Sequence, residues 1–279
     1  MKQKILYLLF AFSSFANASI INVDFNSPDT LDAFNVNTAN WRGDVEYRST
    51  GGVGGSGGVG GFSADTTYKA KSFDFSKKGT QITVSAFYKM AAKLEPKPGL
   101  IYGFSEFTLV PEPNSFIYED NVLFANVGQT SDSVQMFGGA LQKDGGVFDG
   151  FMGENPTGII LANRWYQFGV TFTNLGGAIG YQFNVTDFGL DGTAMISEVM
   201  NASFQTPDTH NIGKDKSVYA GVQVIASVPF GYDYGGSVAM DNFSIAYIQG
   251  ENQVPTPSSI TLFLVVLVAM LKRVRLSPH

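Results

Sequence analysis

Residues Val238–Ile248 read V-A-M-D-N-F-S-I-A-Y-I, and this segment is the most informative about the fold. Apolar residues alternate with small or polar ones, which is typical of a half-buried β-strand. Val238 and Met240 fall on one parity of the alternation, whereas the apolar residues from Phe243 onward fall on the other. The apolar face changes sides at Asp241-Asn242, so we expect a β-bulge there.

The same alternation recurs along the chain. Tyr166–Phe172 alternates apolar with polar or small residues, and Ile82–Tyr88 does so except where Phe87 interrupts the polar side. Glycine, aromatic, Val, Thr, Asn and Asp residues between these runs favour strands joined by turns. Only Ala194–Met200 carries a trace of helical periodicity. Roughly ten to thirteen short strands predict an antiparallel β-sandwich. Further strands are expected at Ile20–Phe25, Lys69–Phe75, Phe104–Val110, Val122–Val127, Val134–Phe137, Gly180–Asp187 and Tyr219–Ile225.

The segment Met240–Ile245 resembles the closing strand of concanavalin A-like and carbohydrate-binding-module sandwiches. Together with Val23–Phe25 and Trp165-Tyr166, it makes the body similar to a lectin-type jelly roll. The resemblance implies an all-β, antiparallel jelly-roll sandwich over residues 19–250. It also implies that the first and last strands pair as neighbours.

In many relatives, acids on the first and last strands hold a structural calcium ion. The resemblance assigns that role to Asp24 and Asp241. Calcium takes six to eight oxygen ligands, so backbone carbonyls or further acids would have to contribute. The alternative is that both acids cap turns or face solvent.

Gly51–Gly61 reads G-G-V-G-G-S-G-G-V-G-G. Glycine lets a backbone approach a ligand closely. Such a composition is also typical of a mobile surface loop, and that is the interpretation we favour.

The N-terminus has the pattern of a secretory signal peptide. Lys2 and Lys4 precede the apolar run Ile5–Phe12, and Ala16-Asn17-Ala18 supplies the small residues of a cleavage site. We expect a signal peptide over residues 1–18, with cleavage after Ala18. The alternative is a buried first strand.

The C-terminus, residues 251–279, has the pattern of a membrane-directed tail. Val254-Pro255-Thr256-Pro257 precedes the apolar run Ile260–Leu271, and Lys272, Arg273 and Arg275 follow it. A run of this length is shorter than the roughly 20 residues of an ordinary spanning helix, but tilting and bilayer thinning accommodate such segments. The basic end is expected to stay in the cytoplasm.

This tail resembles the PEP-CTERM sorting signal of Gram-negative bacteria, which combines Pro-Glu-Pro, a short hydrophobic helix and an Arg-rich end. Thr256 stands where the family has Glu. The resemblance implies an exosortase, a membrane protease-transpeptidase, as partner. It also implies export across the inner membrane to the cell surface or extracellular matrix. A plain C-terminal helix and a eukaryotic lipid-anchor signal are the alternatives.

The charge of the body limits its partners. Five of the 18 basic residues lie before Ser19 or after Gln253, which leaves 13 basic against 24 acidic side chains between these positions. Nucleic acid and anionic lipid are poor partners for such a surface, whereas divalent cations and neutral polymers suit it better. The chain has no cysteine, so disulfide and thiol chemistry are excluded.

Catalytic patterns are missing from the body. His210 is its only histidine, so neither a zinc cluster nor a well-supported catalytic triad can be assembled. The Glu-x-Asp-x-x-Glu strand motif of lectin-fold glycosidases is absent too. We therefore expect a binding or structural protein within exopolysaccharide. The alternatives are a polysaccharide hydrolase or lyase on the same fold, and a passive coat protein. Aromatic rings that can stack on sugars, with one acceptor, make the candidate ligand set Trp41, Tyr118, Tyr232, Asp233 and Tyr234.

Overall fold

The computed structural model describes residues 18–37, 45–61, 64–90, 102–114, 122–129, 133–141, 149–155, 158–207, 217–224 and 237–250. These residues form sixteen β-strands and two short 3-10 helices, η2 (Pro28–Ala33) and η3 (Val53–Gly55). Within these ranges no helix is long and apolar enough to span a membrane. The signal segment before Ala18 and the whole predicted tail, including its helix, fall outside the described residues.

One antiparallel sheet, sheet A, has the strand order β14-β13-β12-β7-β16-β4-β3, and β1 pairs with β16 beside this path. In chain order its strands are β1 (Ala18–Val23), β3 (Val45–Arg48), β4 (Gly58–Gly61), β7 (Gln81–Met90), β12 (Trp165–Asn174), β13 (Ala178–Gly189), β14 (Ser197–Pro207) and β16 (Ser237–Ile248).

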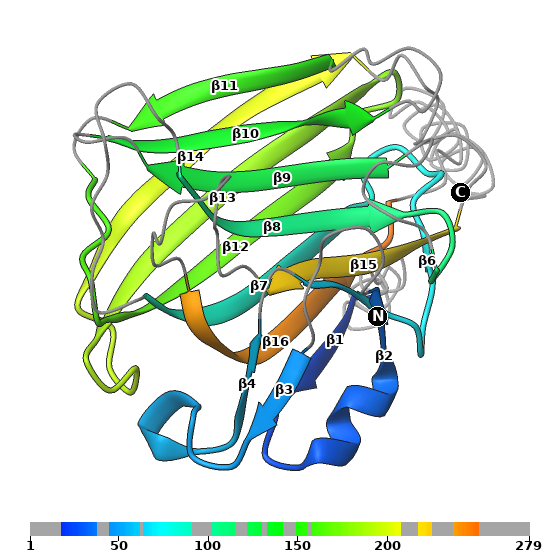
Figure 1. The fold of residues 1–279 in the computed structure, drawn as a ribbon. Coiled ribbons are helices and arrows are strands. Elements are labelled where there is room, and N and C mark those ends of the chain that lie inside the picture. Colours follow the sequence, from blue (N-terminus) through cyan, green and yellow to red (C-terminus); the bar gives the residue numbers. More distant parts are fainter. Residues whose placement is uncertain are drawn as a thin grey trace, which may run out of the picture.

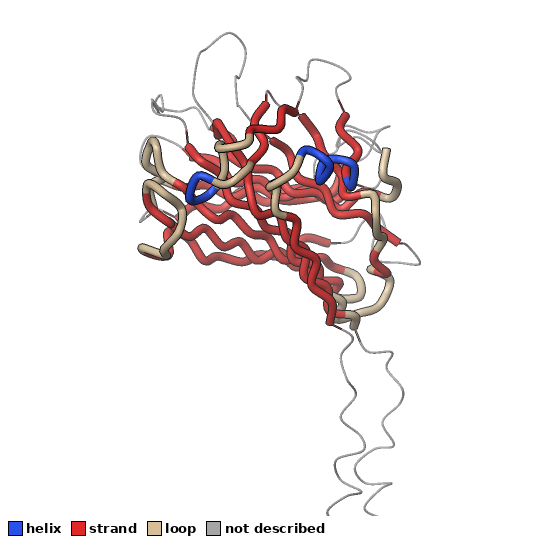
Figure 2. The backbone as a smooth tube through the Cα atoms, turned by 90° about the horizontal axis from the view of Figure 1, so that it is seen from below, coloured by secondary structure: helices blue, strands red, loops and turns tan. Residues whose placement is uncertain are grey.

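The other antiparallel sheet, sheet B, has the order β11-β10-β9-β8-β15-β5-β2, and β6 pairs with β15. It packs on sheet A as the second layer of a sandwich (Figures 1 and 2). Its strands are β2 (Phe34–Asn37), β5 (Ala64–Tyr68), β6 (Phe73–Asp74), β8 (Tyr102–Val110), β9 (Val122–Gln129), β10 (Val134–Leu141), β11 (Asp149–Asn155) and β15 (Ser217–Val224).

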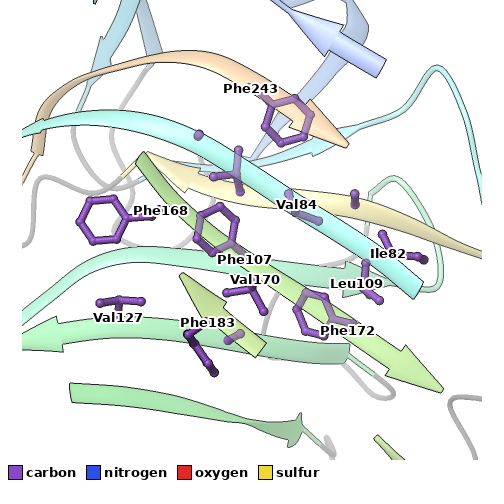
Figure 3. Close-up of a cluster of buried hydrophobic side chains, with 14 of the residues drawn as sticks. Ile82, Val84, Phe107, Leu109, Val127, Phe168, Val170, Phe172, Phe183 and Phe243 are labelled. Atoms are coloured by element: carbon purple, nitrogen blue, oxygen red, sulfur yellow. The ribbon is translucent and has the colours of Figure 1, made fainter. Parts of the chain in front are cut away.

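The core lies between the two sheets and is rich in phenylalanine. Phe168 and Phe172 of β12 are fully buried and belong to the same cluster as Phe107 and Leu109 of β8 (Figure 3). Burying one such side chain stabilises a fold by about 1.5–3 kcal/mol. Because every second residue of these strands enters the core, the other side chains of sheet A are left on its outer face.

The strand β16 contains the irregularity that its sequence predicts. The register between β16 and β7 shifts between Asp241 and Ser244, and Asn242 has a φ of 49°. Met240 before the shift and Phe243 after it are both buried in the core. The predicted bulge is therefore confirmed. β1 also pairs with β16 along its whole length, from Ala18 opposite Ile248 to Val23 opposite Phe243, as the resemblance implied.

Other predictions were wrong in part. The helical piece expected near Ala194–Met200 is a loop that leads into β14, because pairing with β13 fixes this segment as an edge strand. The strand expected at Lys69–Phe75 shrinks to β6. The glycine-rich segment is not an exposed loop throughout, since its second half is β4, which pairs with β3 and β16.

Candidate functional site

Some of the site residues predicted from the sequence lie within the described ranges, and others lie outside them. All five candidate ligand residues, Trp41, Tyr118, Tyr232, Asp233 and Tyr234, fall outside them, as do Ala16 and the sorting residues Val254, Pro255, Thr256 and Pro257. Asp24, Asp241 and Ala18 are described. Ala18 is the first residue of β1, so cleavage after it would leave the rest of that strand in place.

The outer face of sheet A presents four rows of side chains across β16, β7, β12, β13 and β14. The pairing registers give the rows directly, because residues opposite one another on neighbouring strands point to the same face. In strand order, row one is Asp241, Phe87, Gln167, Thr186 and Glu198, and row two is Ser244, Ser85, Gly169, Asn184 and Asn201. Row three is Ala246, Thr83, Thr171, Gln182 and Ser203, and row four is Ile248, Gln81, Thr173, Gly180 and Gln205.

The half of this face over β16, β7 and β12 carries paired hydroxyls. The Ser85 and Ser244 hydroxyls lie 2.7 Å apart, and so do those of Thr83 and Thr171. Each hydroxyl can donate one hydrogen bond and accept two, so pairing leaves acceptor capacity on every oxygen.

The half over β13 and β14 carries amides around one acid. Asn201 donates to the Glu198 carboxylate at 3.2 Å, and Asn184 lies 3.5 Å from the same oxygen. The Thr186 hydroxyl donates to the Asn184 side-chain carbonyl at 2.9 Å. Gln182 and Ser203 are exposed beside them. This half therefore offers both donors and acceptors.

An aromatic pair lies at one end of the face. The rings of Phe87 and Phe188 are 4.7 Å apart between centroids and meet at 62°, an edge-to-face arrangement. Both are partly exposed. An aromatic ring beside polar side chains suits the apolar face of a sugar ring. Phe87 is the residue that broke the polar side of its strand in the sequence, so a signal for this site was present; Phe188 had none.

Two loops border the aromatic pair, and we call them the loop pair: residues 51–57, around η3, and residues 190–196, between β13 and β14. They lie side by side at the lower left of Figure 1. The Gly54 N–H donates to the Asp191 carbonyl at 2.8 Å. A Cβ on Gly192 would lie 2.9 Å from the indole of Trp165, which is only 2% exposed. The 190–196 loop therefore covers Trp165.

Asp241 holds the first of these loops. Its Oδ2 accepts hydrogen bonds from the Val53 N–H at 2.9 Å and the Ser56 hydroxyl at 3.0 Å, and its Oδ1 accepts from the Asn242 N–H at 2.7 Å. Asp241 is 2% exposed, whereas Asp24 faces solvent. Among the described residues no group of three or more acids or histidines could hold a metal ion. Calcium at Asp24 and Asp241 stays a prediction.

An ion pair supports the second loop. Arg164 Nε lies 3.1 and 3.0 Å from the two carboxylate oxygens of Asp187, and its Nη2 lies 2.7 Å from Oδ2. The hydrogen bond to Asp187 raises the pKa of Arg164 above its usual value. Asp187 also accepts from the Gly189 N–H at 2.7 Å, and its carbonyl accepts from the Ile196 N–H at 2.8 Å. These contacts fix where the loop leaves β13 and enters β14.

No protein-family model and no curated protein matches the chain. Solved structures do share its fold. Arcelin-5, a lectin-like defence protein of Phaseolus vulgaris, is 11% identical, with a TM-score of 0.52 over 85% of this chain and 100% of its own. The winged bean acidic lectin, solved with methyl-α-D-galactose, is 9% identical, with a TM-score of 0.52 over 84% and 100% of the two chains. The basic winged bean lectin, solved with Tn-antigen, is 10% identical, with a TM-score of 0.50 over 82% and 98%.

These likenesses confirm the predicted concanavalin A-like sandwich at the level of the fold. The resemblance of the tail to a PEP-CTERM signal is not tested by them and stays a prediction.

Proposed function

We propose that this protein binds polysaccharide outside the cytoplasm, and that the outer face of sheet A is the binding surface. The aromatic pair beside four rows of hydroxyls and amides is the observation that carries the proposal. The fold adds support, since two of the similar structures are lectins that were solved with a sugar ligand.

The charge of the face favours an uncharged polymer. Of the twenty positions in the rows, only Asp241 and Glu198 are charged, and the 51–57 loop covers Asp241. A neutral sugar loses no ionic hydration on binding, whereas burying a charged group carries a desolvation cost. The rings of Phe87 and Phe188 would contact the apolar face of one sugar, while the amides of Asn184 and Gln182 would bond the hydroxyls of the next.

The spacing of the two acids favours binding over hydrolysis. Asp241 and Glu198 stand at opposite ends of row one, four strand spacings apart. At about 4.8 Å per spacing they are roughly 19 Å apart. Glycoside hydrolysis needs two carboxylates about 5–10 Å apart. We therefore propose that this face does not act as an enzyme; a hydrolase or lyase remains the alternative if polysaccharide is shortened by the purified chain.

The predicted ends supply the location in this proposal. A signal peptide over residues 1–18 and an exosortase-type sorting tail over 251–279 would deliver the body to the cell surface or extracellular matrix. Mass spectrometry of the mature protein should show a chain that starts at Ser19 and lacks the residues after Pro257. A mature chain that still ends at His279 would contradict the sorting proposal.

Binding is tested with the intact chain by affinity electrophoresis in gels that contain one neutral polysaccharide each, including exopolysaccharide of the source organism. Replacing Phe87 and Phe188 by Ala should weaken binding about tenfold, which is the effect of about 1.4 kcal/mol. Val36→Ala is the control, because Val36 is 37% exposed on β2 at the edge of sheet B, away from this face. If the wild type and the double variant are retarded equally, the binding site does not lie on this face. No retardation in any gel would refute the function.

A further inference from the structure

We infer that Asp241 is a positioning residue, which holds the loop pair against the binding face through the bulge of β16. Its effect on carbohydrate rests on the proposed function, whereas its effect on structure rests on hydrogen bonds and packing contacts. Contacts between parts of the chain far apart in sequence lead from Asp241 at the bulge to Trp165.

The Asp241 carboxylate lies on the outer face, and the bulge follows directly after it. Asn242 takes a positive φ of 49°, and its N–H binds Asp241 Oδ1, which fixes the carboxylate beside the outer face. In a regular strand, residues 242 and 243 would continue the pairing with β7 without a shift. Phe243 and the apolar residues after it would then face away from the core. The bulge therefore serves both the core and the orientation of Asp241.

The carboxylate then organises the glycine-rich loop. Val53 N–H and the Ser56 hydroxyl both donate to Oδ2, and Gly52 N–H closes the loop on the Ser56 carbonyl at 2.8 Å. A Cβ on Gly52 would lie 2.6 Å from the same Oδ2. The loop can pack this close only because glycine has no side chain.

The first loop in turn holds the second. The Gly54 N–H binds the Asp191 carbonyl, as described above. In addition, Gly192 lies between Val53 and Trp165: a Cβ added to Gly192 would be 3.1 Å from the Val53 side chain and 2.9 Å from the indole. Without the Asp241 carboxylate, Val53 and Gly54 lose the support that keeps the 190–196 loop on Trp165.

The second loop matters to a ligand because it carries apolar side chains next to the aromatic pair. Leu190, Met195 and Ile196 are 65%, 62% and 61% exposed. The register that pairs Asp187 with Ser197 places Ile196 opposite Phe188 when it is continued by one residue. Moving the loop would therefore change what a sugar on Phe188 meets.

Fluorescence of Trp165 tests the structural step. The chain has two tryptophans, so Trp41→Phe leaves Trp165 as the only emitter. In that background Asp241→Ala should shift the emission to the red and increase quenching by acrylamide. Asp241→Asn keeps one acceptor oxygen and should restore much of the protection. Ser56→Ala removes the hydroxyl that contacts Asp241 Oδ2 and the carbonyls of Val53 and Gly57, but it keeps the bond from Val53 N–H to Asp241. It is the milder variant should Asp241→Ala not fold. Asp32→Ala, at an exposed acid in η2, is the control and should change nothing.

Affinity electrophoresis of the same substitutions with Trp41 present tests the functional step. Asp241→Ala should weaken retention at least about tenfold, or about 1.4 kcal/mol, and Asp241→Asn should recover part of it. Unchanged Trp165 quenching in Asp241→Ala and Ser56→Ala would overturn the inference. Exposed Trp165 with unchanged affinity would also overturn it, since the loops would then not bear on the ligand. If the wild type binds no polysaccharide, the proposed function fails, while the Trp165 result still decides whether Asp241 holds the loops.

Discussion

Asp74 shows how one partly exposed side chain can connect distant parts of the chain. Its carboxylate accepts hydrogen bonds from the Ser76 N–H and hydroxyl, lies 3.9 Å from the Lys77 ammonium and 3.4 Å from the Gln249 amide. Its carbonyl accepts from the Tyr247 hydroxyl at 3.0 Å. The turn after β6 is thereby joined to the end of β16.

The pKa of Asp74 predicts a loss of stability in acid. The hydrogen bond from the Ser76 hydroxyl lowers this pKa below the usual value, which is about 3.9 in an unfolded chain. A lowered folded-state pKa means that these contacts stabilise the fold fully above about pH 4, and that their contribution disappears as the pH falls through the folded-state pKa. Melting of wild type and Asp74→Asn from pH 7 to pH 3 should show a difference that shrinks towards the acid end. A constant difference would contradict the assignment.

The glycine-rich segment, Gly51–Gly61, is the element whose structure differs most from the sequence-based prediction. Glycine repeats are typical of mobile loops, yet here Gly57 and Gly60 are buried and β4 lies between β3 and β16. A Cβ on Gly57 would lie 2.1 Å from the Phe25 carbonyl oxygen. The glycines are needed because backbone from distant parts of the chain packs on them, and no local pattern reports such neighbours.

Two of these glycines give a matched pair of predictions. Gly57→Ala must push a fixed backbone carbonyl aside, so it should lower the free energy of unfolding by about 2–3 kcal/mol. The atoms nearest to a Cβ on Gly60 belong to the guanidinium end of Arg48, 2.4 Å away at Cζ, and the far end of a long side chain gives way more easily than backbone. Its cost should stay below about 1 kcal/mol. Urea denaturation of the two variants checks the order, and equal costs would show that the backbone contact does not limit this segment.

For the whole molecule, the decisive contact joins the first strand to the last. Ala18 pairs with Ile248, so nearly the entire described chain lies between the two partners. Contacts of such long sequence separation make folding slow, because the loop-closure entropy is lost before the contact forms. The pairing could be expected from the resemblance to lectin-type sandwiches, not from either strand alone.

Calcium, if it binds at Asp24 and Asp241, would act at this scale, since it would link the start of the chain to its last strand. We predict that calcium then raises the melting temperature and that a chelator lowers it, because a ligand that binds only the folded state stabilises it. Magnesium at equal concentration is the control. A melting temperature that none of these additions changes would remove both acids from the metal assignment and leave Asp241 its hydrogen bonds alone.

How much of the structure can be predicted from the sequence depends on how far apart in the chain the contacting residues lie. The bulge at Asp241-Asn242 follows from an alternation within eleven residues, and the structure confirms it. The partner of Asp241 could not be predicted, because Val53 lies 188 positions away. Likewise Phe87 stood out on its own strand, but Phe188 meets it only across β12. Local alternation gives strands and faces; their assembly into a binding face depends on register.

The pairing of Ala18 with Ile248 also fixes how the body can be held. Asp241, beside the loop pair, and Ile248 are seven residues apart on β16, a strand length of about 23 Å. Ala18 and Ile248, near the two ends of the described chain, therefore lie at one end of the sandwich, and the loop pair lies at the other. A tether attached at either the N-terminal or the C-terminal side would leave the loop pair pointing away from the attachment point. An N-terminal anchor could therefore replace a C-terminal one without changing the orientation of the sandwich.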